Sequence, residues 1–210
     1  PQPGISFVSD NGKEWEDLSK VLFIGILKAY TVSDLGITSN LEKFYKNDTP
    51  FVAKVGANET VIFEFGDKNY TVIADENGSA IIPIDADVGG YSITTTYNNV
   101  SIVNYVLIKS TIVSSNVTRG YNSNYNYKIQ VLTSAGTPLN NTQVPISVNG
   151  KSKNYTTDAS GYVTVPFTKL TKQQTIVVVN PSNDDKKQTK IVVKSRFTGA
   201  SNVAMYYFDG

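Results

Sequence analysis

The sequence predicts an all-β protein in which one type of domain occurs twice in tandem. Two observations lead to this prediction. Short stretches in which apolar and polar residues alternate recur between turn signals, as half-buried strands do. In addition, a short motif ending in tyrosine returns at Tyr45, Tyr121 and Tyr207, which are 76 and 86 residues apart. These intervals are domain-sized and exceed the repeats of about 20–50 residues that build solenoids.

The repeated motif sets the expected domain boundaries. It reads Thr38–Tyr45, then Ser114–Tyr121, then Ala200–Tyr207. We therefore expect one domain over residues 35–110, a second over 111–196, and the start of a third repeat at 197–210. Residues 1–34 match neither repeat, and we expect an N-terminal capping or preceding segment there, either a helix beginning near Trp15 or one or two strands.

The second repeat gives the clearer strand pattern. Residues 127–132, 144–148, 151–157 and 162–167 alternate or are rich in β-branched residues, and residues 175–179 and 189–194 follow. Asn149-Gly150 is a strong hairpin signal, and Asp158-Ala159-Ser160-Gly161 has the composition of a turn. With residues 115–121 this makes about seven short strands, which is typical of an immunoglobulin-like (Ig-like) β-sandwich.

The first repeat matches the second piece by piece. Its strands are expected at residues 61–66, 80–84, 89–97 and 100–109, and Asp75-Glu76-Asn77-Gly78 corresponds to the turn at Asp158. One loop differs, because nothing after Lys54-Val55 corresponds to residues 133–140. The predicted fold class is therefore all-β, with tandem Ig-like β-sandwich domains.

Composition restricts the possible functions. The chain has no cysteine and no histidine, so it lacks disulfides, thiolate nucleophiles, the usual general base and the usual transition-metal ligands. We therefore expect no enzyme, no catalytic residues, no cofactor and no metal, and we interpret the acidic turns at Asp75 and Asp184 as ordinary turns. A net charge of +1 predicts no large basic field and no nucleic-acid partner.

Comparison of the repeats suggests one covalent crosslink. Lys54, Glu64 and Asn104 stand where the second repeat has Gln130, Ser147 and Thr189. A buried neutral lysine could attack the asparagine side-chain carbonyl with help from a protonated acid, which would form an isopeptide bond and release ammonia. The alternative is that Lys54 and Glu64 simply face water, where a cross-strand pair contributes only about 0.2–1 kcal/mol.

Eight asparagines lie in Asn-x-Ser/Thr sequons, which accept glycans only in an exported chain. They are Asn47, Asn58, Asn69, Asn77, Asn99, Asn116, Asn140 and Asn154. Tyrosines of the second repeat could also form a sugar-stacking platform, although aromatic residues in strands more often serve packing. These tyrosines are Tyr125, Tyr127, Tyr155 and Tyr162.

With these motifs in view, the chain resembles adhesin-like surface proteins of methanogenic archaea built from tandem bacterial-Ig-like domains of the invasin/intimin type. The residues that show the resemblance are Gly136–Leu139, Val144–Gly150, Tyr155–Asp158 and Gly161–Val165, with Asn69–Thr71, Asp75–Gly78 and Gly90–Tyr97 from the first repeat. The resemblance covers residues 35–210. It implies an extracellular, cell-surface location and a role in attachment, and it implies no catalytic residues.

The sequence therefore favours a stalk of an extracellular adhesin. Such a stalk would display a binding region for another cell or a surface glycan, with the binding region and the membrane or wall anchor both outside these residues. Two alternatives remain open. The repeats could themselves bind a carbohydrate or a cell surface, or they could be accessory domains of a larger cell-wall-active enzyme.

Overall fold

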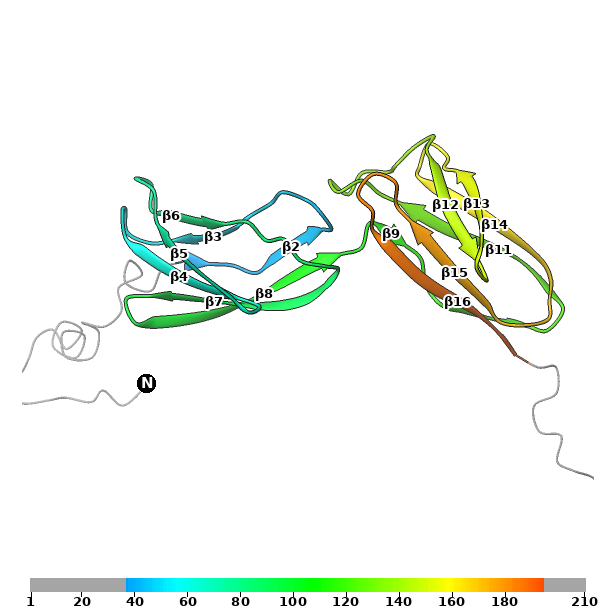
Figure 1. The fold of residues 1–210 in the computed structure, drawn as a ribbon, viewed down its shortest axis with the longest axis horizontal. Coiled ribbons are helices and arrows are strands. Elements are labelled where there is room, and N and C mark those ends of the chain that lie inside the picture. Colours follow the sequence, from blue (N-terminus) through cyan, green and yellow to red (C-terminus); the bar gives the residue numbers. More distant parts are fainter. Residues whose placement is uncertain (1–36, 195–210) are drawn as a thin grey trace, which may run out of the picture. The chain divides into compact units, whose positions relative to one another are not determined.

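The structure, a computed structural model, describes residues 37–194 and is all-β (Figure 1). The expectations for residues 1–34 and for a third repeat at 197–210 lie outside the described residues. The chain divides into two compact units. Within the described part of the chain, one comprises residues 37–42 together with Asp48–Asp85 and Gly89–Leu107, and the other comprises Lys43–Asn47, Ala86–Val88 and residues 108–194.

Sixteen strands are present in the described residues. The first sandwich contains β1 (Ile37–Thr38), β2 (Leu41–Phe44), β3 (Phe51–Lys54), β4 (Thr60–Phe65), β5 (Lys68–Ile73), β6 (Ser79–Ile82), β7 (Gly89–Tyr97) and β8 (Val100–Lys109). The second contains β9 (Ile112–Val113), β10 (Val117–Gly120), β11 (Ser123–Val131), β12 (Gln143–Val148), β13 (Lys151–Thr156), β14 (Tyr162–Leu170), β15 (Gln174–Val179) and β16 (Lys186–Lys194).

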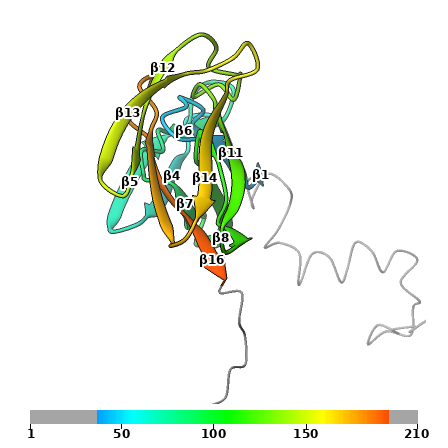
Figure 2. The same ribbon diagram turned by 90° about the vertical axis from the view of Figure 1, so that its right-hand side faces the viewer.

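Both sandwiches have the same strand order. In the first, a three-stranded sheet β1-β3-β6 packs against a five-stranded sheet β2-β8-β7-β4-β5. In the second, the corresponding sheets are β9-β11-β14 and β10-β16-β15-β12-β13. Figure 2 shows the two layers of the second sandwich, with β11 and β14 on one side and β12 and β13 on the other. The predicted fold class, tandem Ig-like β-sandwiches, is confirmed by this topology.

Alternation along the strands fills each core. In the first sandwich Phe51 and Phe63 are almost fully buried and meet edge to face, with ring centroids 6.0 Å apart. In the second, Tyr127, Ile146 and Ile176 are buried in one continuous cluster. Because side chains of a strand point alternately to either face, the residues between these positions face solvent.

The Ser-Asn pair of the repeated motif marks the point where the first strand changes sheet. In the first sandwich the chain pairs with β3 through β1 and then joins β8 through β2. Between them, the Asn40 side-chain oxygen accepts a hydrogen bond from the Tyr105 backbone N–H at 2.8 Å. Asn116 does the same for the Lys190 N–H, also at 2.8 Å. The motif therefore recurs because an asparagine replaces one ladder hydrogen bond at the crossover.

A second repeated element is the Asp-x-x-Gly turn. The Asp158 carboxylate accepts hydrogen bonds from the backbone N–H groups of Ser160 and Tyr162. Asp75 accepts equivalent bonds from Asn77 and Ser79. The bonds from the Ser79 and Asn77 N–H groups, together with the nearby Lys54 charge, lower the pKa of Asp75 below its ordinary value.

The repeats differ in two loops. The chain connects β3 to β4 through residues 55–59, whereas residues 132–142 connect β11 to β12. The second difference is in the turn between the last two strands of each sandwich. In the first sandwich Asn98 and Asn99 connect β7 to β8 in a two-residue turn, and both have positive φ angles. The corresponding turn between β15 and β16 spans residues 180–185. This longer turn carries most of the buried polar groups described below.

Candidate functional site

The three residues of the crosslink hypothesis do not meet. Lys54 is exposed at the end of β3, in the three-stranded sheet, and Glu64 is exposed on β4, in the five-stranded sheet. Asn104 lies on β8 with the parity of the buried Val106 and Ile108, and therefore points inward. The reaction needs a buried lysine beside a buried acid, and the described residues provide neither at these positions.

Lys54 instead has a local role that its counterpart shares. Its Nζ donates a hydrogen bond to Oγ of Ser79, which directly follows the Asp-x-x-Gly turn and is the first residue of β6. In the second sandwich Gln130 Nε2 donates to the Ser160 carbonyl oxygen of the equivalent turn, at 3.0 Å. The lysine and the glutamine therefore both bond next to the Asp-x-x-Gly turn, the lysine to the strand residue that follows it and the glutamine to the turn itself.

The inward position of the Asn104 amide is also explained by comparison with the second sandwich. Its Oδ1 is buried and has no hydrogen-bond partner. At the corresponding position in the second sandwich, Thr189 Oγ1 accepts a hydrogen bond from the Tyr127 hydroxyl at 2.9 Å. Phe51 replaces Tyr127 in the first sandwich and has no hydroxyl. The unpaired amide oxygen thus reflects the loss of a donor rather than a reactive group.

Thr95 shows the same kind of divergence and allows a test. Its Oγ1 is buried without a partner on β7, where β15 has Val178. We expect Thr95→Val to stabilise the first sandwich by about 1 kcal/mol, because it removes a buried, unpaired hydroxyl. Urea unfolding followed by hydrogen exchange in β4 and β7 measures the change. Thr94→Val, at the neighbouring outward position, is the control, and an equal gain there would contradict this explanation.

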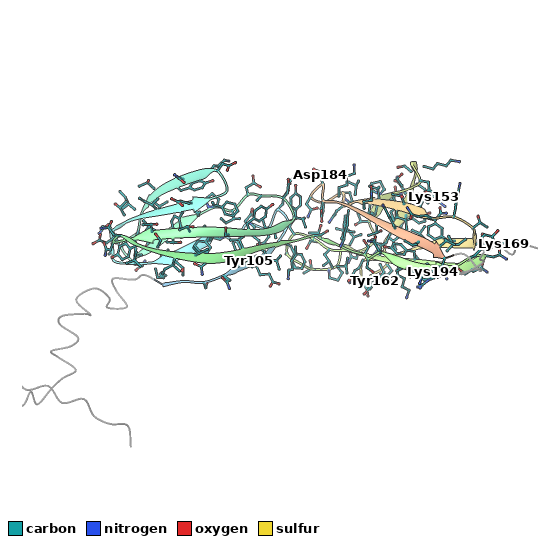
Figure 3. All side chains as sticks on the ribbon, turned by 90° about the horizontal axis from the view of Figure 1, so that it is seen from below. Tyr105, Lys153, Tyr162, Lys169, Asp184 and Lys194 are labelled. Atoms are coloured by element: carbon teal, nitrogen blue, oxygen red, sulfur yellow. The ribbon has the colours of Figure 1, made fainter. Side chains whose placement is uncertain are left out.

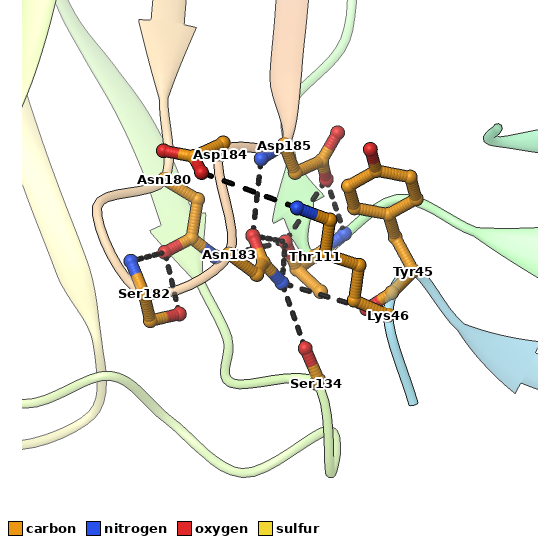
Figure 4. A network of polar contacts seen from close by, with 9 residues as sticks. All are labelled: Tyr45, Lys46, Thr111, Ser134, Asn180, Ser182, Asn183, Asp184 and Asp185. Atoms are coloured by element: carbon orange, nitrogen blue, oxygen red, sulfur yellow. Dashed lines mark hydrogen bonds and ion pairs between the residues drawn. The ribbon is translucent and has the colours of Figure 1, made fainter. Parts of the chain in front are cut away.

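The most extensive polar cluster of the described residues lies in the unit of the second sandwich (Figure 4). Its centre is the carboxylate of Asp185, which is 4% exposed. One oxygen, Oδ2, accepts three hydrogen bonds: from the Thr111 N–H at 2.7 Å, from Thr111 Oγ1 at 2.9 Å and from Ser110 Oγ at 2.8 Å. Hydrogen bonds to an ionised acceptor are among the stronger ones in proteins.

Two asparagines of the same turn complete the cluster. Asn180 is fully buried, and its Nδ2 donates to Thr111 Oγ1 at 2.8 Å and to the Leu132 carbonyl oxygen at 2.7 Å. Asn183 accepts from the Asp185 N–H at 3.1 Å and donates to Ser134 Oγ at 3.0 Å. The β15–β16 turn is therefore bonded to the segment that follows β11 and to the segment that precedes β9.

We name Ser110, Thr111, Asn180, Asn183 and Asp185 the connector anchor. Ser110 and Thr111 are the two residues that separate β8 from β9, so they connect the sandwiches in the chain. Sequence patterns do not indicate this cluster, because its members are about seventy residues apart and turns have no periodicity to indicate burial. The one available signal was the longer, asparagine-rich turn of the second repeat.

The sequons divide by exposure. Seven asparagines are exposed: Asn58, Asn69, Asn77, Asn99, Asn116, Asn140 and Asn154. The eighth, Asn47, is half-buried, and its Nδ2 donates to the Ser134 carbonyl oxygen at 2.9 Å. Because N-linked glycans attach to the side-chain nitrogen of asparagine, Asn47 is the least accessible of the eight acceptors. Their glycosylation stays a prediction.

The tyrosines do not form the sugar-stacking platform. Tyr127 is buried, and Tyr125 lies under the Arg119 guanidinium, whose central carbon is 3.8 Å from the ring centroid. Tyr155 is half-buried on β13, which leaves Tyr162 on β14 as the exposed member. Within residues 37–194, no group of three or more acidic side chains is arranged to hold a metal ion. No helix in the same range has the length and hydropathy of a membrane span.

No protein-family model and no curated protein matches the chain. Among solved structures, fibronectin(III)-like modules of Clostridium thermocellum CbhA match 80% of this chain and 96% of theirs, at 17% identity and a TM-score of 0.28. The I9–I11 tandem of titin matches 76% and 65%, at 8% identity and 0.41. The carbohydrate acetylesterase XAC1771 of Xanthomonas citri matches 42% of this chain, at 17% identity and 0.31, and the match spans 21% of that enzyme. At these scores, no functional argument follows from the matches.

Proposed function

We propose that the two sandwiches form a load-bearing stalk of an extracellular adhesin, which holds a binding region away from the cell that carries it. The observation that most supports this proposal is the connector anchor. A flexible tether would leave the connecting residues solvated, whereas here Thr111 is fully buried and bonded to Asp185 and Asn180. A connection whose residues are held by hydrogen bonds has little slack, which is a property of a stiff spacer rather than of a flexible tether.

Two strands near opposite ends of the second sandwich in sequence also suit a load-bearing role. β10 and β16 pair in parallel, with Val117 opposite Ile191 and Gly120 opposite Lys194. The chain enters the domain through β9, ahead of β10, and β16 is the last strand of the domain. Tension along the chain therefore slides the two strands past each other, so that their hydrogen bonds resist together instead of opening one after another.

Force spectroscopy on the 210-residue chain tests the proposal. We expect discrete, cooperative extension steps, and we expect Asn116→Ala to lower the unfolding force of the second sandwich, because Asn116 bonds β16 beside the loaded pair. Asn124→Ala is the matched control, since Asn124 Oδ1 accepts from the Lys169 N–H at 3.0 Å, in the β11–β14 part of the sandwich. Gradual extension without steps, or equal effects of the two variants, would overturn the proposal.

A further inference from the structure

The whole-chain net charge conceals an uneven division between the sandwiches. Residues 37–110 contain five lysines against five aspartates and four glutamates, a net charge of −4. Residues 111–194 contain nine lysines and one arginine against three aspartates, a net charge of +7. The expectation that the chain has no large basic field rested on the average of +1, and the second sandwich does not fit it.

The positive charge of the second sandwich is concentrated on strands. Its eight strands contain no acidic residue, since its three aspartates lie in turns. On β16 the odd-numbered Thr189 and Ile191 are buried, so the even-numbered residues face outward. Lys186, Lys190 and Lys194 are all exposed there (Figure 3 labels Lys194), and we name these three residues the lysine row.

The outward residues beside the lysine row are neutral. Val179 and Thr175 of β15 pair with Lys186 and Lys190, and Thr118 of β10 pairs with Val192. Farther across the sheet, Ser147 of β12 pairs with Ser152 of β13. The face therefore combines hydroxyl-bearing and apolar side chains around three lysines along one strand.

No acidic side chain neutralises the lysine row from within that face. Asp185 is buried in the connector anchor, where its Oδ2 accepts three hydrogen bonds. Asp184 is exposed in the turn before β16, with its carboxylate 4.0 Å from Lys46 Nζ. Lys187 points inward, and its Nζ donates to the Ile112 carbonyl oxygen at 3.0 Å. The three lysines of the row thus remain available to an external anion.

The spacing of the three lysines in the row indicates the size of the ligand. Successive members of the row are four residues apart on one strand, which corresponds to about 13 Å at roughly 3.3 Å per residue. At this backbone spacing, a single phosphate or sulfate matches the row less well than a longer anion does. A polymer with charges at regular intervals could contact all three, and it would release its bound counterions on doing so.

We propose that the outer face of the β10-β16-β15-β12-β13 sheet binds an anionic polysaccharide along the lysine row. Lysine binds carboxylate or sulfate as a point charge, and Thr118, Thr175 and Gln188 place hydroxyl and amide groups among the lysines for sugar hydroxyls. Nucleic acid fits less well. Arg119, the one arginine of residues 111–194, is stacked on Tyr125, and the strands place no aromatic side chain on this outer face for a base to stack on.

The first sandwich provides an internal comparison for this face. At the positions of Lys186, Lys190 and Lys194 it has Ser101, Tyr105 and Lys109 on β8. Because the two sandwiches share their topology, this difference is in side chains alone. The polyanion site is therefore assigned to the second sandwich and not to the fold in general.

The test uses the 210-residue chain from a cytosolic bacterial host, so that the sequons Asn116 and Asn154 on the same face stay without glycans. Binding to dextran sulfate, polygalacturonate, neutral dextran and double-stranded DNA is measured across salt concentrations. The triple variant Lys186→Gln/Lys190→Gln/Lys194→Gln is compared with Lys128→Gln/Lys169→Gln/Lys172→Gln. The second variant has the same net charge, and its substitutions lie outside the face.

We expect one or both anionic polysaccharides to bind and neutral dextran not to bind, with affinity falling as salt rises. The affinity of the row variant for the polymer should be about tenfold or more lower at low salt, and it should depend less steeply on salt. The affinity of the control variant should fall much less. The two anionic polymers distinguish sulfate from carboxylate recognition. Equal losses in both variants, no binding to either polymer, or tighter binding to DNA than to both would overturn the proposal. None of these outcomes depends on the stalk proposal, which force measurements test separately.

Discussion

Replacing Asp185 by alanine is expected to destabilise the second sandwich by about 3 kcal/mol, among the largest single-residue effects in the described chain. The substitution removes the acceptor of three hydrogen bonds and leaves the Thr111 N–H and hydroxyl buried without it. Each buried donor that loses its partner costs about 1–3 kcal/mol. Truncation of a buried, bonded charge belongs to the short list of severe substitutions.

Hydrogen exchange resolved by mass spectrometry is the appropriate measurement, because it reports each sandwich separately. Protection should fall in β15 and β16 and stay unchanged in β4 and β7. Asp184→Ala is the matched control, since its side chain is 85% exposed and its ion pair with Lys46 is a surface one, for which a loss below about 1 kcal/mol is expected. Asp185→Asn should fall between the two, because it keeps an acceptor oxygen. Equal effects of Asp184→Ala and Asp185→Ala would show that the connector anchor does not stabilise the domain.

Replacing Gly161 by alanine should destabilise the second sandwich by about 3 kcal/mol or more. Gly161 has a φ of +76°, and a Cβ at this position would lie 2.5 Å from the Val131 carbonyl oxygen and 3.1 Å from the Leu139 nitrogen. The backbone conformation alone costs about 1–2 kcal/mol for a residue with a side chain. The steric overlap adds a further cost of about 1–3 kcal/mol, because a strand end and a loop have to move.

Gly150→Ala separates these two costs. Gly150 has a similar φ of +83° in the β12–β13 hairpin, but nothing lies within 4 Å of the position of a Cβ. Gly150→Ala should therefore lower the free energy of unfolding by the conformational cost alone, about 1–2 kcal/mol, measured by urea unfolding of the same chain. If the two variants lose the same stability, the close approach to Val131 is not a constraint. Gly78 of the first sandwich, with a Cβ position 2.2 Å from the Val55 carbonyl oxygen, should behave as Gly161 does.

Sequence patterns were sufficient for most of the fold, because the relevant signals are local. Alternation located β7 and β8, and Asn149-Gly150 located the β12–β13 hairpin, in which Val148 pairs with Lys151. Alternation of apolar and polar residues along β3 also indicates that the Lys54 side chain is exposed. Phe51 and Ala53 of β3 are buried while Lys54 is exposed, which is the water-facing alternative that the pattern had left open.

The candidate sites were harder to predict, because they depend on contacts that no local pattern encodes. The bonds of Thr111 to Asp185 and Asn180 join a connector to a turn about seventy residues away. The unpaired Asn104 oxygen is understandable only once Phe51 is compared with Tyr127 in three dimensions. Net charge misled in another way, because a sum over the chain cancels the opposite charges of its two halves.

The longer turn between β15 and β16 has a consequence for how such modules can be recombined. The side chains that hold the connector belong to the domain that follows it, and Asn98 and Asn99 of the first sandwich form too short a turn to supply equivalents. If Ser110 and Thr111 instead connected another domain to a first sandwich placed after it, the connection would lack a buried acceptor equivalent to Asp185. Exchange of modules at this position is therefore directional: the second sandwich can be transplanted together with Ser110 and Thr111, while the reverse order requires a redesigned turn.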